Sequence, residues 1–93
     1  MRAIADALVY SVTYINLWPD EREEFDDVGA LESIAAFLQD ASTEEQDALA
    51  AAAERALTEE LAAAQPRGNF VADYRTWMED MFGEPWVGNK RTG

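Results

Sequence analysis

The fold is decided by one stretch of sequence, Ser42-Thr43-Glu44-Glu45-Gln46-Asp47-Ala48-Leu49-Ala50-Ala51-Ala52-Ala53-Glu54-Arg55-Ala56-Leu57. Its start has the pattern of a capping box, in which the Ser42 hydroxyl accepts from the amide of Glu45 and the Glu45 carboxylate accepts from the amide of Ser42. The alanines and leucines that follow are strong helix formers. They predict a helix over residues 43–65, ended by Pro66 and Gly68, with an alanine-rich surface that lets other helices pack closely.

Upstream of this helix, the first segment is apolar over most of its circumference. Ile4, Leu8, Val12 and Ile15 recur at helical spacing and predict a helix over residues 3–18, which Pro19 ends. The run over residues 8–17 is also rich in β-branched and aromatic residues, so a strand is the alternative there.

Two further helices are predicted around the central one. Apolar residues at three- and four-residue spacing predict a helix over residues 28–40, with Asp26 or Asp27 as its N-cap. The last helix, over residues 70–82, has Asn69 as its predicted cap and Gly83 at its C-terminal end. Its apolar stripe consists of Phe70, Tyr74, Trp77, Met78 and Met81.

These segments predict an all-α protein, a small irregular four-helix bundle. With 93 residues the chain has the length of one domain. We expect residues 1–83 to form this single helical domain and residues 84–93 to form a C-terminal tail. The alternative fold is α+β, with residues 8–17 as a strand.

The net charge of the chain is confined to one block. Residues 20–60 contain fourteen Asp and Glu against two Arg, a net charge of −12 that equals the total for the chain. Such a block gives a folded domain one strongly negative face, which attracts a basic partner and repels nucleic acid and anionic membrane.

Several functional classes are disfavoured by composition. The chain has no cysteine and no histidine, so disulfides, thiolate or imidazole metal ligands and a Ser-His dyad are excluded. The acidic segment over residues 20–27 lacks the glycine and the register of an EF-hand loop, and no glycine cluster suits a phosphate. We therefore expect no enzyme, no metal and no cofactor. The N-terminus does not read as a signal peptide, so we expect a cytoplasmic location.

The candidate partner-binding residues are the acidic connector and two aromatic side chains. An exposed tyrosine or tryptophan beside carboxylates has the composition of a protein-binding hot spot. Tyr10 lies off the main stripe, Trp18 lies at a predicted helix end and Trp86 lies in the predicted tail, so these three are the expected exceptions to an aromatic core. The candidate set is Tyr10, Trp18, Asp20, Glu21, Glu23, Glu24, Asp26 and Asp27.

The segment from Trp18 to Leu57 loosely resembles small acidic helical proteins that are widespread in bacteria. In size, charge and helix count the whole chain also resembles the immunity proteins that neutralise nuclease bacteriocins and secreted toxins. The tyrosine pair followed by proline that marks the immunity proteins of colicin DNases is missing, and Asn16-Leu17-Trp18-Pro19 is not an equivalent. The resemblance therefore implies an acidic helical face for a basic target, and it assigns no binding residue.

The sequence favours a non-catalytic acidic binding protein that inhibits or shields a basic protein. A toxin-immunity protein is the most concrete form, with a nuclease or another toxin as its partner, and a nucleic-acid mimic is a related one. The alternative is a self-associating structural or adaptor domain, in which Val9, Tyr10 and Leu17 of the first helix bury against a second copy.

Overall fold

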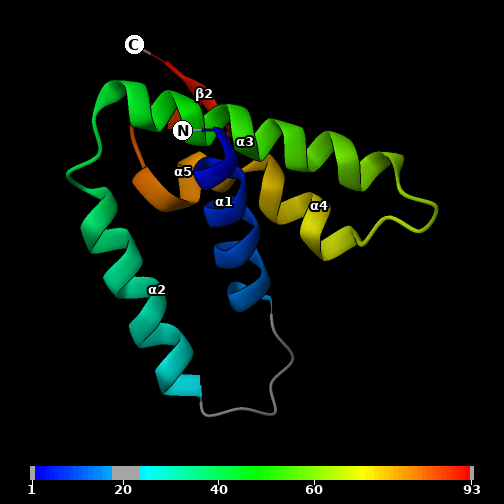
Figure 1. Ribbon diagram of the computed structural model, residues 1–93, viewed down its shortest axis with the longest axis horizontal. Coiled ribbons are helices and arrows are strands. Elements are labelled where there is room, and N and C mark those ends of the chain that lie inside the picture. Colours follow the sequence, from blue (N-terminus) through cyan, green and yellow to red (C-terminus); the bar gives the residue numbers. More distant parts are fainter. Residues whose placement is uncertain (1, 18–23, 93) are drawn as a thin grey trace.

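The structure is a computed structural model of the 93-residue chain, and it describes residues 2–17 and 24–92, with the side chains of residues 24–28 and 30 outside the description. Within these ranges the chain is helical except for one short hairpin (Figure 1). The elements are α1 (Arg2–Asn16), α2 (Glu24–Leu38), α3 (Thr43–Ala62), α4 (Gly68–Arg75), α5 (Trp77–Phe82), β1 (Trp86–Val87) and β2 (Lys90–Arg91). The predicted all-α fold class is confirmed.

The longest helix, α3, is the element against which the others pack. Its predicted capping box is present: the amide of Glu45 donates to Ser42 Oγ at 3.1 Å, and the amide of Ser42 donates to Glu45 Oε1 at 2.8 Å. Figure 1 shows α1 crossing α3, with α4 and α5 on the same side of α3. The small side chains of Ala52 and Ala53, 1% and 0% exposed, permit this close approach.

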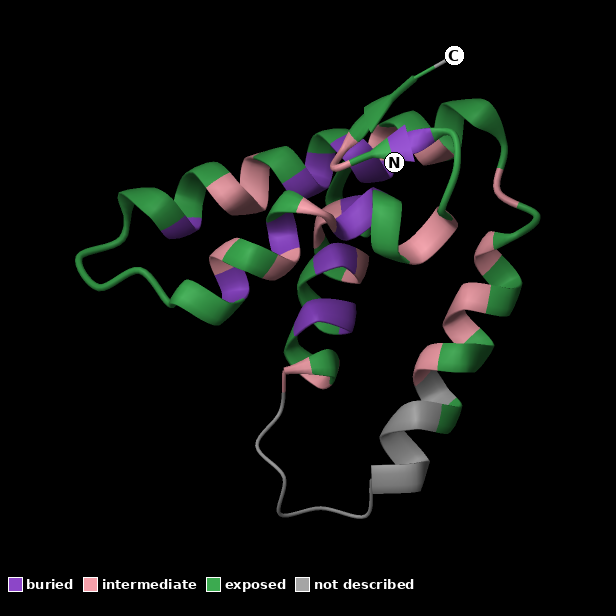
Figure 2. Cartoon of the chain, turned by 180° about the vertical axis from the view of Figure 1, so that it is seen from behind, coloured by how far each residue is buried: buried purple, intermediate pink, exposed green. Residues whose placement is uncertain are grey.

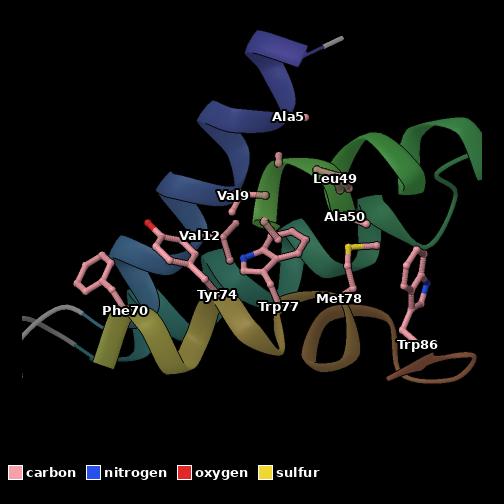
Figure 3. Close-up of a cluster of buried hydrophobic side chains, with 12 residues drawn as sticks. Ala5, Val9, Val12, Leu49, Ala50, Phe70, Tyr74, Trp77, Met78 and Trp86 are labelled. Carbon is pink, nitrogen blue, oxygen red and sulfur yellow. The ribbon is translucent and has the colours of Figure 1, made fainter. Parts of the chain in front are cut away.

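The core forms where α1 crosses α3, α4 and α5 (Figures 2 and 3). Val9 of α1 and Met78 of α5 are both 0% exposed. The aromatic stripe predicted for the last helix supplies most of the volume, because Phe70, Tyr74 and Trp77 are buried. The other buried apolar residues are Ala5, Val12, Leu49, Ala50, Ala52, Ala53 and Trp86.

Residues 8–17 lie in a helix up to Asn16, so the strand alternative is wrong. The burial pattern gives the reason, since Ala5, Val9 and Val12 are buried at helical spacing and line one face against α3. The complete burial of Val9 also removes it from the face that was predicted to contact a second copy.

Helix α2 lies to the side of the domain and packs mainly along α1 (Figure 1). It starts at Glu24, so Asp26 and Asp27 lie in its first turn and the prediction of an N-cap there is wrong. Acidic residues are favourable in the first turn of a helix, which explains why the acidic segment continues into α2. Leu31, Ile34 and Leu38 pack against the core, while Phe37 is 81% exposed.

The helix predicted over residues 70–82 is broken at Thr76, whose φ of −119° and ψ of 20° are not helical. The backbone groups at the break are bonded by the hairpin. Asn89 Nδ2 donates to the carbonyl of Tyr74 at 2.7 Å, and Asn89 Oδ1 accepts from the amide of Met78 at 3.0 Å. In an unbroken helix the amide of Met78 would donate to the carbonyl of Tyr74. Asn89 bonds both groups instead, so neither is left without a hydrogen-bond partner at the break.

The prediction of a C-terminal tail over residues 84–93 is wrong, because β1 and β2 pair as an antiparallel hairpin that packs on the core. Trp86 is 4% exposed, and Arg91 Nη2 donates to Asp47 of α3 at 2.6 Å. Gly88 turns the hairpin with a φ of +62°, and a Cβ there would lie 3.2 Å from the carbonyl oxygen of Arg75. Glycine is therefore required at this position on both grounds.

Candidate functional site

Of the predicted partner-binding residues, the structure describes only Tyr10 in full. Trp18, Asp20, Glu21 and Glu23 lie outside the described residues. The backbone of α2 places Glu24, Asp26 and Asp27 in its first turns, and their side chains also lie outside the description. Tyr10 is 49% exposed, as predicted for a residue off the main stripe.

Tyr10 lines a cleft of about 450 Å³ between α1, α3 and α4, which we call the Tyr10 cleft. Tyr74 also lines the cleft, and burial raises the pKa of its phenol, so the hydroxyl is neutral at physiological pH. The residues around it are Asp6, Ala7, Tyr10, Ala52, Arg55, Ala56, Glu59, Glu60, Arg67 and Tyr74.

Both arginines of the Tyr10 cleft are already paired with carboxylates. Arg55 Nη2 donates to Asp6 Oδ1 at 2.7 Å and so joins α3 to α1. Arg67 donates twice from its guanidinium group and once from its backbone amide to Glu60, with the shortest distance 2.7 Å. These hydrogen bonds hold the pKa of the buried Glu60 carboxyl below its ordinary value.

The pairing decides what the Tyr10 cleft can do. Both cations are neutralised, Arg55 by joining α3 to α1 and Arg67 by holding the loop between α3 and α4, so they are poor groups for binding an anion. The exposed carboxylate of Glu59 makes no ion pair within the described part of the chain. The charge left over in the cleft is therefore negative.

A second depression, which we call the α1–α2 groove, has a volume of about 260 Å³. Its floor is mainly apolar and its polar atoms come largely from carboxylates. It is lined by Val12 and Asn16 of α1, Leu31, Glu32 and Ala35 of α2, Asp73 of α4, and Trp77, Asp80 and Met81 of α5.

Asp73 is the electrostatically unusual residue of the α1–α2 groove. Burial, and next the negative charge of Asp80, raise the pKa of its carboxyl group. The nearby Thr13 hydroxyl and the Asn16 amide, whose Nδ2 donates to Asp73 Oδ1 at 3.2 Å, act in the opposite direction. The surroundings of Asp73 therefore disfavour the ionised form of its carboxyl group. Perturbed pKa values of this kind are common at functional sites.

Sequence reasoning missed Asp73, Trp77 and Asp80 as site residues. Residues 61–93 have no net charge, so the charge pattern of the sequence does not point to their carboxylates. A signal was present, since these three residues have the i, i+4, i+7 spacing of one helical face. Carboxylates on both sides of a tryptophan on one face indicate a negative rim around an aromatic surface.

Replacing Asp73 with asparagine should stabilise the protein slightly at pH 7. The folded-state pKa of Asp73 is raised, so its ionisation destabilises the fold as the pH rises from about 4 through that raised value. The neutral amide avoids this penalty and can still accept from Asn16. Urea unfolding at pH 7 and pH 3 measures the free energy of unfolding of both proteins. The variant should be more stable at pH 7 and equally stable at pH 3. An equal gain in stability at both pH values would contradict this account.

Among the described residues, no group of three or more carboxylates is arranged to hold a metal ion. Within the same residues, no helix combines the length and the apolar character needed to cross a bilayer. No protein-family model matches the chain, and no curated protein or solved structure matches it significantly.

Proposed function

We propose that this chain is a non-catalytic acidic binding protein that inhibits or shields a basic protein. The observation that carries the proposal is its charge: a net of −12, all of it from residues 20–60. A toxin-immunity protein is the most concrete form, acting on a nuclease or another toxin of the same bacterial cytoplasm. A mimic of nucleic acid, with carboxylates in the place of phosphates, is the related variant.

The ion pairs of the structure support this proposal. Arg55, Arg67 and Arg91 are each bonded to a carboxylate of the same chain at 2.6–2.7 Å. These three cations therefore join elements of the fold, and within the described part of the chain the carboxylates that make no ion pair are left without internal compensation. Of these, Glu32, Asp40, Glu44 and Glu59 are exposed on α2, α3 and the turn between them. A negative surface of this kind speeds association with a basic protein and selects against other partners.

Binding to a basic partner predicts a strong dependence on salt. The protein is first used as bait in lysate of its own host, and the captured protein is then purified and studied alone by stopped-flow fluorescence. The association rate constant should fall by at least about tenfold between low salt and physiological salt, because electrostatic steering is screened. An association rate that is indifferent to salt would contradict the proposal.

Self-association is the second candidate, and exposed apolar residues favour it. Ile4 and Phe37 are 74% and 81% exposed. Buried together in a dimer, these side chains would form an apolar contact that salt does not weaken. Light scattering after size-exclusion chromatography at low and high salt separates the candidates. A monomer at both salt concentrations supports the acidic binding protein, and a salt-resistant dimer that captures no basic protein supports the adaptor domain.

A further inference from the structure

The α1–α2 groove has the shape and chemistry to hold one long side chain. Its space of about 260 Å³ lies between helices from both ends of the sequence. The apolar residues of its floor are Val12, Leu31, Ala35, Trp77 and Met81. A flexible aliphatic chain gains free energy by covering such a floor, provided that its polar end finds partners at the rim.

The rim of the α1–α2 groove is formed by carboxylates whose charges are not compensated. Asp80 Oδ2 accepts from the Thr76 hydroxyl at 2.8 Å and Asp73 accepts from Asn16, both of which are neutral donors. No lysine or arginine of the described part of the chain lines the groove. Arg75 is exposed and lies two residues from Asp73, a spacing at which helical side chains do not face each other.

A buried donor in the same groove lacks an acceptor. Trp77 is 3% exposed, and its indole Nε1 has no hydrogen-bond partner among the described residues. Figure 3 shows this nitrogen turned toward Val12, which also lines the groove. Buried N–H groups are nearly always bonded, so this nitrogen is an unsatisfied position in the wall of the groove.

The groove is also close to the predicted acidic binding residues. Glu32 lies five residues after Asp27 on α2, which corresponds to about 7.5 Å along the helix axis. A partner bound at the start of α2 is therefore within reach of the groove.

We propose that the α1–α2 groove receives an arginine side chain of the basic protein partner, with the guanidinium group among Glu32, Asp73 and Asp80. This proposal rests on the proposed function and names where that partner is anchored. The aliphatic part of the arginine covers Val12, Leu31 and Met81 beside the indole of Trp77. Arginine suits the site better than lysine, because its planar group donates to several carboxylates at once and is more weakly hydrated.

The test uses a single arginine as the probe. N-acetyl-L-arginine methylamide is titrated into the full chain, and N-acetyl-L-citrulline methylamide, its neutral isostere, is the matched control. The indole N–H signal of Trp77 is followed by NMR after assignment with Trp18→Phe and Trp86→Phe. We expect a saturable shift of this signal and of the groove amides with a Kd of about 1 mM, the weak range expected for one side chain, and no saturable shift with citrulline.

Two substitutions, one on α2 and one in the turn that follows it, provide the matched control within the protein. Glu32→Gln removes a rim charge and should weaken binding of the arginine probe about three- to fivefold, as expected for one exposed carboxylate. Asp40→Asn removes an exposed charge in the turn after α2, outside the groove, and should leave the Kd nearly unchanged. Asp73→Asn should weaken binding while raising stability at pH 7. An equal response to citrulline, or equal effects of Glu32→Gln and Asp40→Asn, would overturn the proposal.

Failure of this inference and failure of the proposed function give different results. If the arginine probe leaves the Trp77 signal unchanged while a basic partner still binds with a salt-dependent rate, the groove is not the anchor and the proposed function stands. If the probe titrates Trp77 but partner association is indifferent to salt, the proposed function is wrong and the groove remains a site for a guanidinium group.

Discussion

Replacing Trp86 with alanine is expected to lower the free energy of unfolding by about 3–5 kcal/mol. The indole is 4% exposed, and its Nε1 donates to Gln46 Oε1 of α3 at 3.3 Å. The guanidinium group of Arg91 lies 4.5 Å from the ring centroid and covers one side of it. Because a domain of this size has a total stability of roughly 5–14 kcal/mol, the substitution removes a large part of it.

The neighbouring residue of the same strand provides the control. Val87 is 63% exposed, so Val87→Ala should change the free energy of unfolding by less than about 0.5 kcal/mol. Urea unfolding followed by circular dichroism measures both variants, since it does not depend on tryptophan fluorescence. Equal stabilities for the two variants would show that the hairpin contributes nothing to the folded domain.

The helices could be predicted because their signals are local. The capping box involves two residues three positions apart, and the alanine-rich run fills its helix with strong helix formers. The stripe from Phe70 to Met78 was correctly assigned to the core, because large apolar residues at helical spacing have no better place in a small domain. Sequence patterns of this kind specify which face is buried without knowledge of the partner helix.

The hairpin and the break at Thr76 could not be predicted, because each depends on the other. Asn89 bonds to backbone groups of Tyr74 and Met78, which are 15 and 11 residues away. The amide of Glu79 likewise donates to the carbonyl of Gly88 at 2.9 Å. Without these long-range bonds the segment over residues 70–82 reads as one helix, and residues 84–93 read as a tail. Tertiary contacts here override a helical pattern.

Of the candidate partner-binding residues, the structure describes only Tyr10 in full. Tyr10 was correctly identified as exposed, because it lies off the face that packs on α3. The α1–α2 groove was not identified, since four helices contribute to it and no single segment shows the arrangement. Net charge summed along the sequence also conceals Asp73 and Asp80, because Arg67 and Arg91, which balance them in the sum, bond instead to Glu60 and Asp47.

Replacing Glu21, Glu23 and Glu24 together with lysine is expected to abolish binding of the basic partner while the fold is retained. The substitution reverses three charges in the densest part of the acidic block. Steering then turns into local repulsion, and the association rate constant should fall by about a hundredfold at low salt. Stopped-flow association with the purified partner measures this effect, and a circular dichroism melt checks that the helices remain.

A second triple variant separates position from total charge. Asp40→Lys, Glu59→Lys and Glu84→Lys change three exposed residues, and the resulting net charge equals that of the first variant. If only the long-range electrostatic field mattered, the association rate constant would decrease by the same factor in both variants. We expect the second variant to lose much less of the association rate and to keep nearly all of the complex lifetime, because its charges contribute to the long-range field but lie outside the predicted acidic segment over residues 20–27. Unchanged binding in the first variant would refute the acidic face as the partner-binding surface, and equal losses in both would reduce its role to nonspecific attraction.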